Sequence, residues 1–209
     1  MKATLAIPVL LTSCLFLQLD SVHAQQRGGA AWLEEFEDNR RNWTLIQSKR
    51  LSSEVAEGQL WLRGNTGFEG NLFAVNHPLP LQEDFTLSLS LTHHSGQKNM
   101  AFGLVWGAKL DERDLFAFLI TVNGKYTILK KQRGRYDAIK HWTESQWVFK
   151  SGEQNELTIE RKGEQLHFYL NEVLVFTGPY ESSRGDRVGV LFHGKMKLSI
   201  DSLELKLSE

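Results

Sequence analysis

Cysteine is almost absent from this sequence. The single cysteine among 209 residues is Cys14, and it lies inside an apolar N-terminal run. A chain that loses this run has no thiol for a disulfide, a zinc-thiolate site or a cysteine nucleophile. Its length still allows a hydrophobic core large enough to be stable without cross-links.

An excess of charge of either sign is also lacking. Lys and Arg number 24 and Asp and Glu number 25, so the formal net charge is −1. The sequence contains no basic stripe for nucleic acid and no polybasic patch for a membrane surface. We therefore do not expect nucleic acid as a partner.

Long apolar runs are confined to the N-terminus. Lys2 gives a positive start and residues 3–19 are mostly apolar. Val22 and Ala24 then stand three and one residues before a small-residue cleavage point, which is the pattern of a secretory signal peptide. One alternative is a membrane anchor. The other is a lipid anchor on Cys14, because Leu11-Thr12-Ser13-Cys14 resembles a lipoprotein box.

Several features favour the signal peptide over these alternatives. Pro8 and Asp20 interrupt a run that is short of the roughly 20 apolar residues a membrane span needs. Apolar residues also continue past Cys14, where a lipoprotein turns polar. Removal of the signal would take away one charge of each sign and leave no transmembrane segment.

The rest of the chain is expected to form one domain. We predict a signal peptide over residues 1–24, a short lead-in over 25–30 and a single domain over 31–209. An exported chain without disulfides fits a bacterial periplasmic, extracellular or cell-surface protein better than a eukaryotic secreted one.

Alternation with a period of two residues recurs throughout this domain. The clearest example runs over residues 85–92, where Phe and Leu alternate with Thr and Ser. About a dozen such runs, separated by turn dipeptides, predict short antiparallel strands with one face on a core. The sequence allows at most one helical turn, over residues 143–146, between Trp142 and Trp147.

Residues 101–131 give the strongest local prediction. The stretch reads as three strands, and Asn123-Gly124 separates the last two. An Asn-Gly pair between β-rich runs predicts a hairpin with a type I′ turn. Together with the other strands, it predicts a sandwich of two antiparallel sheets.

Three blocks of the sequence resemble concanavalin A-like (lectin/glucanase) jelly-roll domains. The blocks are Phe36-Glu37-Asp38-Asn39 with Trp43, the Phe102–Gly107 strand with the hairpin around Asn123-Gly124, and Gly152–Ile159 with Leu166–Asn171. The chain is similar to exported domains of Bacteroidetes-like bacteria and, loosely, to the 3-keto-disaccharide hydrolase domain. The resemblance implies an all-β jelly roll and carries no catalytic residue.

Patterns that would carry catalysis or bind metal are missing. The Glu-x-Asp-x-x-Glu strand motif of jelly-roll glucanases does not occur, and the acidic Asp111–Asp114 segment reads as a solvated loop. His93 and His94 are adjacent, so a strand would point them to opposite faces. We predict no catalytic residue, no metal ligand and no cofactor.

Aromatic residues are the best remaining candidates for binding. The chain has 6 Trp, and aromatic faces can stack on the apolar faces of sugars. Trp43 and Trp106 are expected in the core. Trp61 and Tyr169 break the hydrophobic-in rule. We predict a carbohydrate-binding surface from these two residues, from His167 on the same face as Tyr169, and from Tyr126 just past the predicted turn.

These observations favour an exported, non-catalytic module that binds a glycan or polysaccharide on a sheet face. One alternative is a carbohydrate-active hydrolase acting on a sugar derivative, which needs two convergent carboxyl groups. Another is a structural or interaction protein of the envelope, without a small ligand, for which a large exposed apolar patch would be expected.

Overall fold

Every regular element in the described part of the chain is a β-strand. A computed structural model describes residues 30–67, 70–77, 79–80, 83–182 and 185–208. The strands are β1 (Ala30–Glu34), β2 (Leu51–Ala56), β3 (Gln59–Gly64), β4 (Gly70–Asn76), β5 (Phe85–Gly96), β6 (Phe102–Ala108), β7 (Leu115–Thr121), β8 (Lys125–Gln132), β9 (Arg135–Glu144), β10 (Gln154–Lys162), β11 (Gln165–Leu170), β12 (Val173–Pro179), β13 (Arg187–His193) and β14 (Met196–Leu207). Within the described ranges, no helix has the length and apolar character that crossing a membrane requires.

The predicted signal peptide, with the proposed lipid site at Cys14, lies outside the described residues. Residues 25–29 of the predicted lead-in do so as well. Residue 30, which the sequence placed in the lead-in, already belongs to β1.

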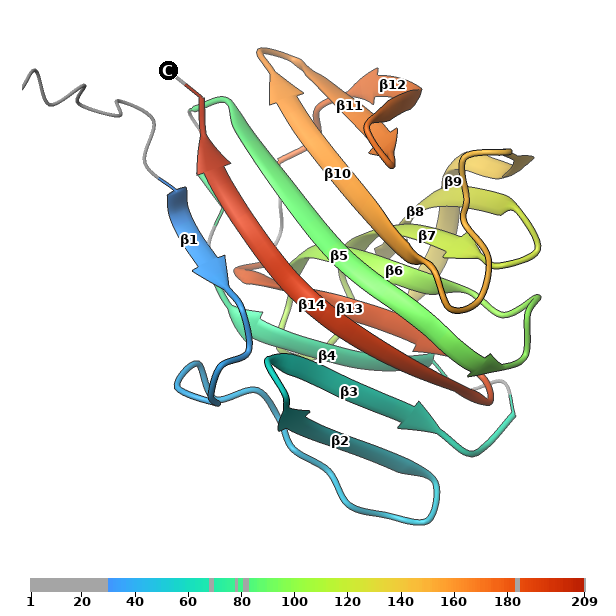
Figure 1. The fold of residues 1–209 in the computed structure, drawn as a ribbon. Coiled ribbons are helices and arrows are strands. Elements are labelled where there is room, and N and C mark those ends of the chain that lie inside the picture. Colours follow the sequence, from blue (N-terminus) through green and yellow to red (C-terminus); the bar gives the residue numbers. More distant parts are fainter. Residues whose placement is uncertain (1–29, 68–69, 78, 81–82, 183–184, 209) are drawn as a thin grey trace, which may run out of the picture.

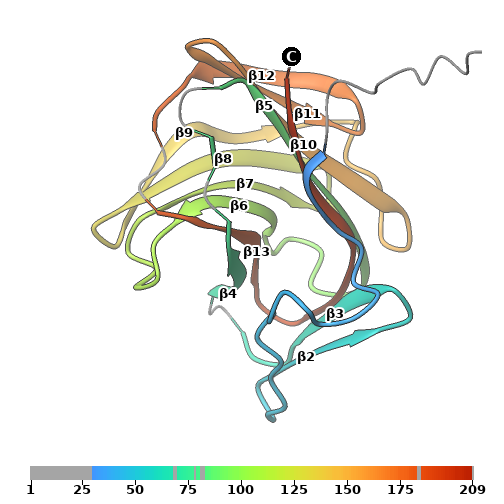
Figure 2. The same cartoon turned by 90° about the vertical axis from the view of Figure 1, so that its left-hand side faces the viewer.

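The strands form two antiparallel sheets that face each other (Figure 1). The eight-stranded sheet has the order β12-β11-β10-β5-β14-β3-β2, with β1 also paired to β14. The six-stranded sheet has the order β4-β13-β6-β7-β8-β9, and Figure 2 shows it as a second layer beside the first. The predicted all-β sandwich of two antiparallel sheets is confirmed.

Inward-facing side chains of both sheets build one large core. Along β5 the alternation places Phe85, Leu87, Leu89 and Leu91 inside, each with 1% or less of its surface exposed. The bulkiest fully buried side chains come from both sheets and from the N-terminal loop: Trp43, Trp106, Phe36, Phe73, Phe85, Phe102, Phe118, Phe168 and Phe192. Trp43 and Trp106 are therefore core residues, as predicted.

Two central strands are buried on both faces. All residues of β6 and β7 are buried, and Val105, Ala117 and Leu119 form a second apolar cluster on the outer face with Leu191 of β13. The expectation of one polar face per strand is wrong here, because the outward positions of these strands carry small or apolar residues instead of polar ones.

The hairpin at Asn123-Gly124 exists, but its turn type differs from the prediction. Thr121 pairs with Lys125, so the loop has three residues, and the Gly124 N–H donates to the Thr121 carbonyl at 2.9 Å. Only Gly124 has a positive φ, 89°, which fits a type I turn followed by a left-handed glycine. The residue pair Arg133-Gly134, with φ of 52° and 85°, has the type I′ pattern instead.

Two other local expectations also change. The helical turn over residues 143–146 is wrong, because Thr143 and Glu144 extend β9 and pair with β8. Asp114, expected in a solvated loop, is buried: its Oδ1 accepts the Arg133 N–H at 2.8 Å, and its Oδ2 lies 2.7 Å from Lys109 Nζ. Lys109 belongs to the same loop as Asp114, whereas Arg133 comes from the β8–β9 hairpin, a contact that local sequence does not reveal.

Close strand packing makes Gly189→Ala a test of the second sheet. A methyl group at this position would lie 2.0 Å from the carbonyl oxygen of Phe73 on β4. Overpacking of this kind lowers the free energy of unfolding by about 1–3 kcal/mol. Gly67→Ala is the control, because nothing lies within 4 Å of its added methyl group. Chemical denaturation should show a loss for Gly189→Ala alone, and equal stabilities would contradict this packing.

Candidate functional site

The four residues predicted to bind a glycan do not lie in one site. Trp61 on β3 and both His167 and Tyr169 on β11 face outward on the eight-stranded sheet, opposite buried neighbours. Three strands separate β3 from β11, so at the usual spacing the two strands lie about 19 Å apart. Tyr126 is buried, with 4% of its surface exposed.

The ring of Trp61 is already covered by neighbouring side chains. Lys197 Nζ lies 4.1 Å from its ring centroid, and the His94 ring lies 4.9 Å away at a tilt of 35°. A hollow of about 240 Å³ beside it is lined by Gln47, Ser52, Glu54, Trp61, Leu62, Arg63 and Lys197. A sugar that stacks on this indole would compete with Lys197 and His94 for contact with the ring.

His167 and Tyr169 belong to a polar network on the sheet surface. The Tyr169 hydroxyl donates to Glu160 Oε2 at 2.6 Å, and this bond, with burial, raises the pKa of Tyr169 to about 12. Burial raises the pKa of Glu160, but hydrogen bonds from Tyr169 and Lys162 outweigh it and lower the pKa overall. His167 Nδ1 shares a 3.1 Å hydrogen bond with Thr177 Oγ1.

Tyr126 joins the two sheets at their open edge. Its ring packs edge-on against Phe118 in the core, and its hydroxyl donates to the Val175 carbonyl of β12 at 2.8 Å. Burial of this hydroxyl raises the pKa of Tyr126. Of the four predicted residues, Tyr126 is therefore the one that joins β8 to the opposite sheet.

A hollow of about 330 Å³ opens beside Tyr126, and we call it the edge cleft. Its lining comes from β8, from the end of β9 and the loop after it, and from β12: Tyr126, Thr143, Glu144, Ser145, Gln146, Trp147, Leu174 and Val175. Figure 1 shows β9 and β12 on the same side of the molecule. The edge cleft thus lies where the two sheets meet at their edges.

The loop over residues 145–153, here called the aromatic loop, presents two large apolar side chains to solvent. Trp147 is 41% exposed and Phe149 is 40% exposed. Leu174, across the edge cleft from this loop, is 51% exposed. Exposed aromatic and apolar surface beside polar side chains is the usual make-up of a sugar-binding surface.

Two asparagines hold the aromatic loop in place. Asn155 is fully buried; its Oδ1 accepts the Phe149 N–H at 2.8 Å, and its Nδ2 donates to the Phe149 carbonyl at 3.2 Å. Asn171, in the β11–β12 turn, donates to the Trp147 carbonyl at 2.7 Å and to Asn155 Oδ1 at 3.2 Å. The backbone beside both exposed aromatics is therefore held by side-chain amides, that of the buried Asn155 and that of the partly exposed Asn171.

A second hollow, of about 630 Å³, adjoins the edge cleft at the end of the sandwich. We call it the loop-end hollow, and its lining comprises Lys98, Val122, Asn123, Gly124, Ser145, Gln146, Val148, Lys150 and Ser151. The two hollows share Ser145 and Gln146. One extended ligand could therefore contact both.

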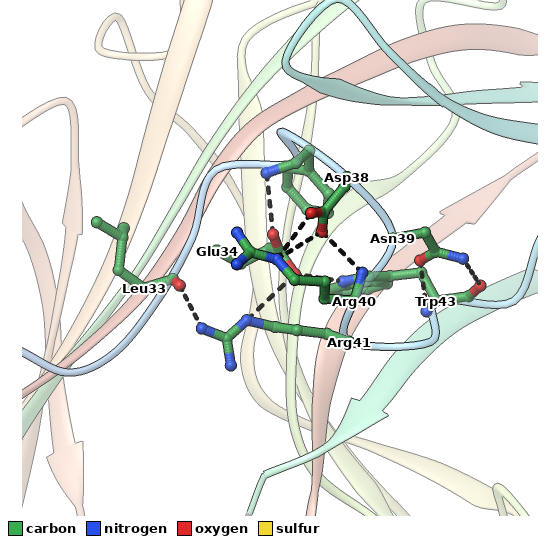
Figure 3. A network of polar contacts seen from close by, with 8 residues as sticks. Leu33, Glu34, Asp38, Asn39, Arg40, Arg41 and Trp43 are labelled. Atoms are coloured by element: carbon green, nitrogen blue, oxygen red, sulfur yellow. Dashed lines mark hydrogen bonds and ion pairs between the residues drawn. The ribbon is translucent and has the colours of Figure 1, made fainter.

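A third hollow, of about 350 Å³, is rich in acidic side chains but is organised around structural contacts (Figure 3). Its lining consists of Leu33, Glu34, Glu35, Glu37, Asp38, Arg40 and Arg41. The carboxylate of Glu34 is buried and accepts the Phe36 N–H and the Trp43 indole N–H, both at 2.9 Å. Arg41 Nε lies 3.3 Å from the same carboxylate.

Strain in the N-terminal loop supports this structural role. Phe36 has a φ of 55° although it is bulky, and its side chain is fully buried. A non-glycine residue in this left-handed region of backbone conformation carries a strain of about 1–3 kcal/mol, so the surrounding contacts must hold Phe36 there.

Asp38, in the same loop, is a poor general acid. A backbone hydrogen bond from Arg40, together with the Arg40 side chain, lowers the pKa of Asp38.

The described residues contain no group of three His, Cys, Asp or Glu side chains placed to hold a metal ion. His93 and His94 point to opposite faces, as predicted. His93 stacks on Phe102 in the core, and its Nδ1 shares a 2.9 Å hydrogen bond with Ser151 of the aromatic loop. This histidine therefore supports the floor of the loop-end hollow.

Sequence reasoning missed the aromatic loop as a site. Trp147 was expected to follow a helical turn. Its carbonyl is held by Asn171, 24 residues further along the chain. Trp147 and Phe149 are two residues apart, but the loop forms no strand, so this spacing gave no usable signal.

Comparisons with known proteins show the fold of this chain but no family to which it belongs. No family model matches the chain, and no curated protein matches it. The carbohydrate recognition domain of Emp47p superposes with a TM-score of 0.62 at 12% identity, over 85% of this chain and 95% of that domain. The carbohydrate-binding module CBM66 from Bacillus subtilis gives a TM-score of 0.52 at 13% identity, over 79% of this chain and 92% of that module.

A larger enzyme contains a similar domain. Xylan beta-1,4-xylosidase from Bacillus halodurans gives a TM-score of 0.60 at 19% identity; the match covers 83% of this chain and only 38% of the enzyme. At these identities the likeness shows the fold alone. The fold is the concanavalin A-like jelly roll of lectins and glucanases, which confirms the predicted class.

Asn155→Ala tests the anchoring of the aromatic loop. The substitution leaves the Phe149 N–H and carbonyl without their side-chain partner, which should lower the free energy of unfolding by about 1–3 kcal/mol. Amide hydrogen exchange should rise over residues 147–150. Asn76→Ala is the control, since Asn76 is exposed at the end of β4. Unchanged exchange in Asn155→Ala would contradict the anchoring role.

His93 should make the stability depend on pH. Burial lowers the pKa of His93 below the value of about 6.5 expected in the unfolded chain. Below pH 6.5 the unfolded state therefore binds a proton that the folded state does not, and the free energy of unfolding falls as the pH decreases. Burial also lowers the pKa of His77, His94 and His193, which adds to the same trend.

Urea denaturation at pH 7 and pH 5 measures this trend. The stability loss between the two pH values should be smaller in His93→Gln than in the unsubstituted protein. His141→Gln, at an exposed position on β9, is the control and should keep the full loss. A loss of the same size in His93→Gln would argue against a buried, neutral His93.

Proposed function

We propose that this protein is an exported, non-catalytic module that binds a glycan through the edge cleft and the aromatic loop. The observation that carries the proposal is Trp147, an anchored and half-exposed aromatic side chain beside a polar hollow. The indole would stack on the apolar face of a sugar ring. Thr143, Glu144 and Gln146 line the same cleft and offer hydroxyl, carboxylate and amide groups to the sugar hydroxyls.

Fixed backbone geometry supports binding at this place. A loop that is ordered before a ligand arrives does not lose conformational entropy on binding, which improves affinity. The carbonyl of Trp147 and the N–H of Phe149 are both held by asparagine side chains, so the aromatic loop is ordered in this way. The sequence favoured the outward face around Trp61. This face is a weaker candidate because Lys197 and His94 already contact the indole ring of Trp61.

Structural neighbours agree with this proposal as analogies. Two of them are a carbohydrate recognition domain and a carbohydrate-binding module. One fold hosts many functions, so these names add support without identifying a ligand. Export follows as part of the proposal from the signal-peptide pattern over residues 1–24.

A hydrolase acting on a sugar derivative is the second candidate, and the acidic hollow at Glu34 is the observation that favours it. Glycosidases need one carboxyl group as acid and another as nucleophile or base. Glu34 is engaged by Phe36 and Trp43, and the edge cleft has Glu144 as its single carboxylate among the described lining residues. The geometry therefore supports binding better than cleavage.

Trp147→Ala tests the proposed site. The purified protein would be screened on an array of plant and bacterial-wall oligosaccharides, and the best hit measured by isothermal titration calorimetry. Loss of the stacking surface should weaken binding by about tenfold, which corresponds to about 1.4 kcal/mol. The recovered oligosaccharide should be uncleaved.

Trp142→Ala is the matched control, because Trp142 is 47% exposed on the neighbouring strand and lines neither the edge cleft nor the loop-end hollow. Trp61→Ala tests the sheet face in parallel. If Trp147→Ala binds as well as the unsubstituted protein and Trp61→Ala loses binding, the glycan site lies on the sheet face around Trp61. Absence of any glycan ligand would contradict the proposed function.

A further inference from the structure

The loop-end hollow carries positive charge without a matching acidic group. Lys98, from the β5–β6 loop, and Lys150, from the aromatic loop, both line it, and none of its described lining residues is acidic. Neither lysine forms an ion pair with any described residue. Glu153, which does not line the hollow, accepts the backbone N–H of Lys150 with its carboxylate at 3.1 Å.

Neutral hydrogen-bond donors accompany these lysines. Thr121 donates its hydroxyl proton to the side-chain oxygen of Asn123, which leaves the Asn123 NH₂ group unpaired within the described part of the chain. Gln146 also lines the hollow and makes no side-chain hydrogen bond to a described residue. Two ammonium groups and two amide groups thus border one hollow, a donor set suited to an anion.

The surroundings fix where an anionic group would go. Glu144 lines the edge cleft but not the loop-end hollow, so the cleft disfavours a carboxylate while the adjoining hollow favours one. Ser145 and Gln146 line both and mark the passage between them. A saccharide that stacks on Trp147 would therefore direct an acidic substituent past Gln146 toward the lysines.

We propose that the loop-end hollow is a subsite for the anionic substituent of an acidic saccharide, a carboxylate or a sulfate. This inference rests on the proposed function and specifies its ligand class. Lys98 and Lys150 bind the anionic group, and the amides of Asn123 and Gln146 complete its hydrogen bonds. Neutral sugars would use the edge cleft alone.

The experiment compares acidic with neutral saccharides. The purified protein is titrated with galacturonate and glucuronoxylan oligosaccharides and with sulfated galactan oligosaccharides, which contain no uronate. The neutral counterparts are the methyl-esterified uronate saccharides and the desulfated galactans. The acidic forms should bind more tightly than their neutral counterparts, and the preference should shrink as salt rises from 50 mM to 500 mM. Sodium sulfate and sodium acetate alone test whether the saccharide is needed.

A double variant, Lys98→Ala with Lys150→Ala, tests the residues. Exposed ion pairs each change affinity severalfold, so the variant should bind the acidic ligand about tenfold more weakly and the neutral counterpart unchanged. Lys49→Ala, at an exposed position before β2, is the control. The carboxylated and sulfated arms show which anion is recognised.

The outcomes separate this inference from the proposed function. Equal affinity for acidic and neutral forms, with loss in Trp147→Ala, would overturn the acidic subsite and leave glycan binding intact. The same would hold if the double lysine variant kept the acidic preference. Binding of the free anions as tightly as the saccharides would also overturn it, and binding of no saccharide of either kind would contradict both proposals.

Discussion

The inner faces of the two sheets are apolar, and they leave water only by packing against each other. This constraint decides where ligands can be bound, because side chains that fill the core are not accessible. Tyr126 shows the boundary: its ring belongs to the core, while its hydroxyl reaches the Val175 carbonyl at the edge. Side chains that can contact a ligand are therefore found at the sheet edges and in the loops where the strands end.

A buried polar group at such a boundary must be satisfied by the protein itself. Asn155 and Asn171 meet this need by hydrogen bonding to the backbone of the aromatic loop and to each other. Both asparagines lie in the sequence block that resembles jelly-roll domains. The resemblance therefore points to a structural device that orders a loop, and the exposed Trp147 and Phe149 on that loop are not part of the shared pattern.

Period-two alternation predicted the strands and their faces well because it is a local property. Leu60 and Leu62 face inward and Trp61 faces outward, as expected. Whether an outward aromatic is available depends on other strands, and here Lys197 and His94 cover the indole. In the same way, the dipeptide Asn123-Gly124 alone did not determine the turn type, because the pairing of Thr121 with Lys125 sets the length of the loop.

Trp147 could not be assigned from the sequence for a related reason. Its position is fixed by Asn171, which a separate hairpin brings beside it. The segment before it gave no clear alternation, so a helical turn was expected where β9 continues to Glu144. Exposure set by long-range hydrogen bonds is invisible to a pattern read along the chain.

The acidic hollow and the loop-end hollow show how a structural cluster differs from a binding one. Glu34 is a buried carboxylate whose hydrogen bonds are all directed to the protein, where they hold the strained Phe36 and the core residue Trp43. Lys98 and Lys150 line a larger hollow and form no ion pair with the described residues. A polar group that stabilises the fold makes its hydrogen bonds to other groups of the protein. A polar group that binds a ligand has hydrogen-bonding capacity left over in the unliganded protein. By this criterion Glu34 belongs to the fold, and the two lysines of the loop-end hollow are free to bind a ligand.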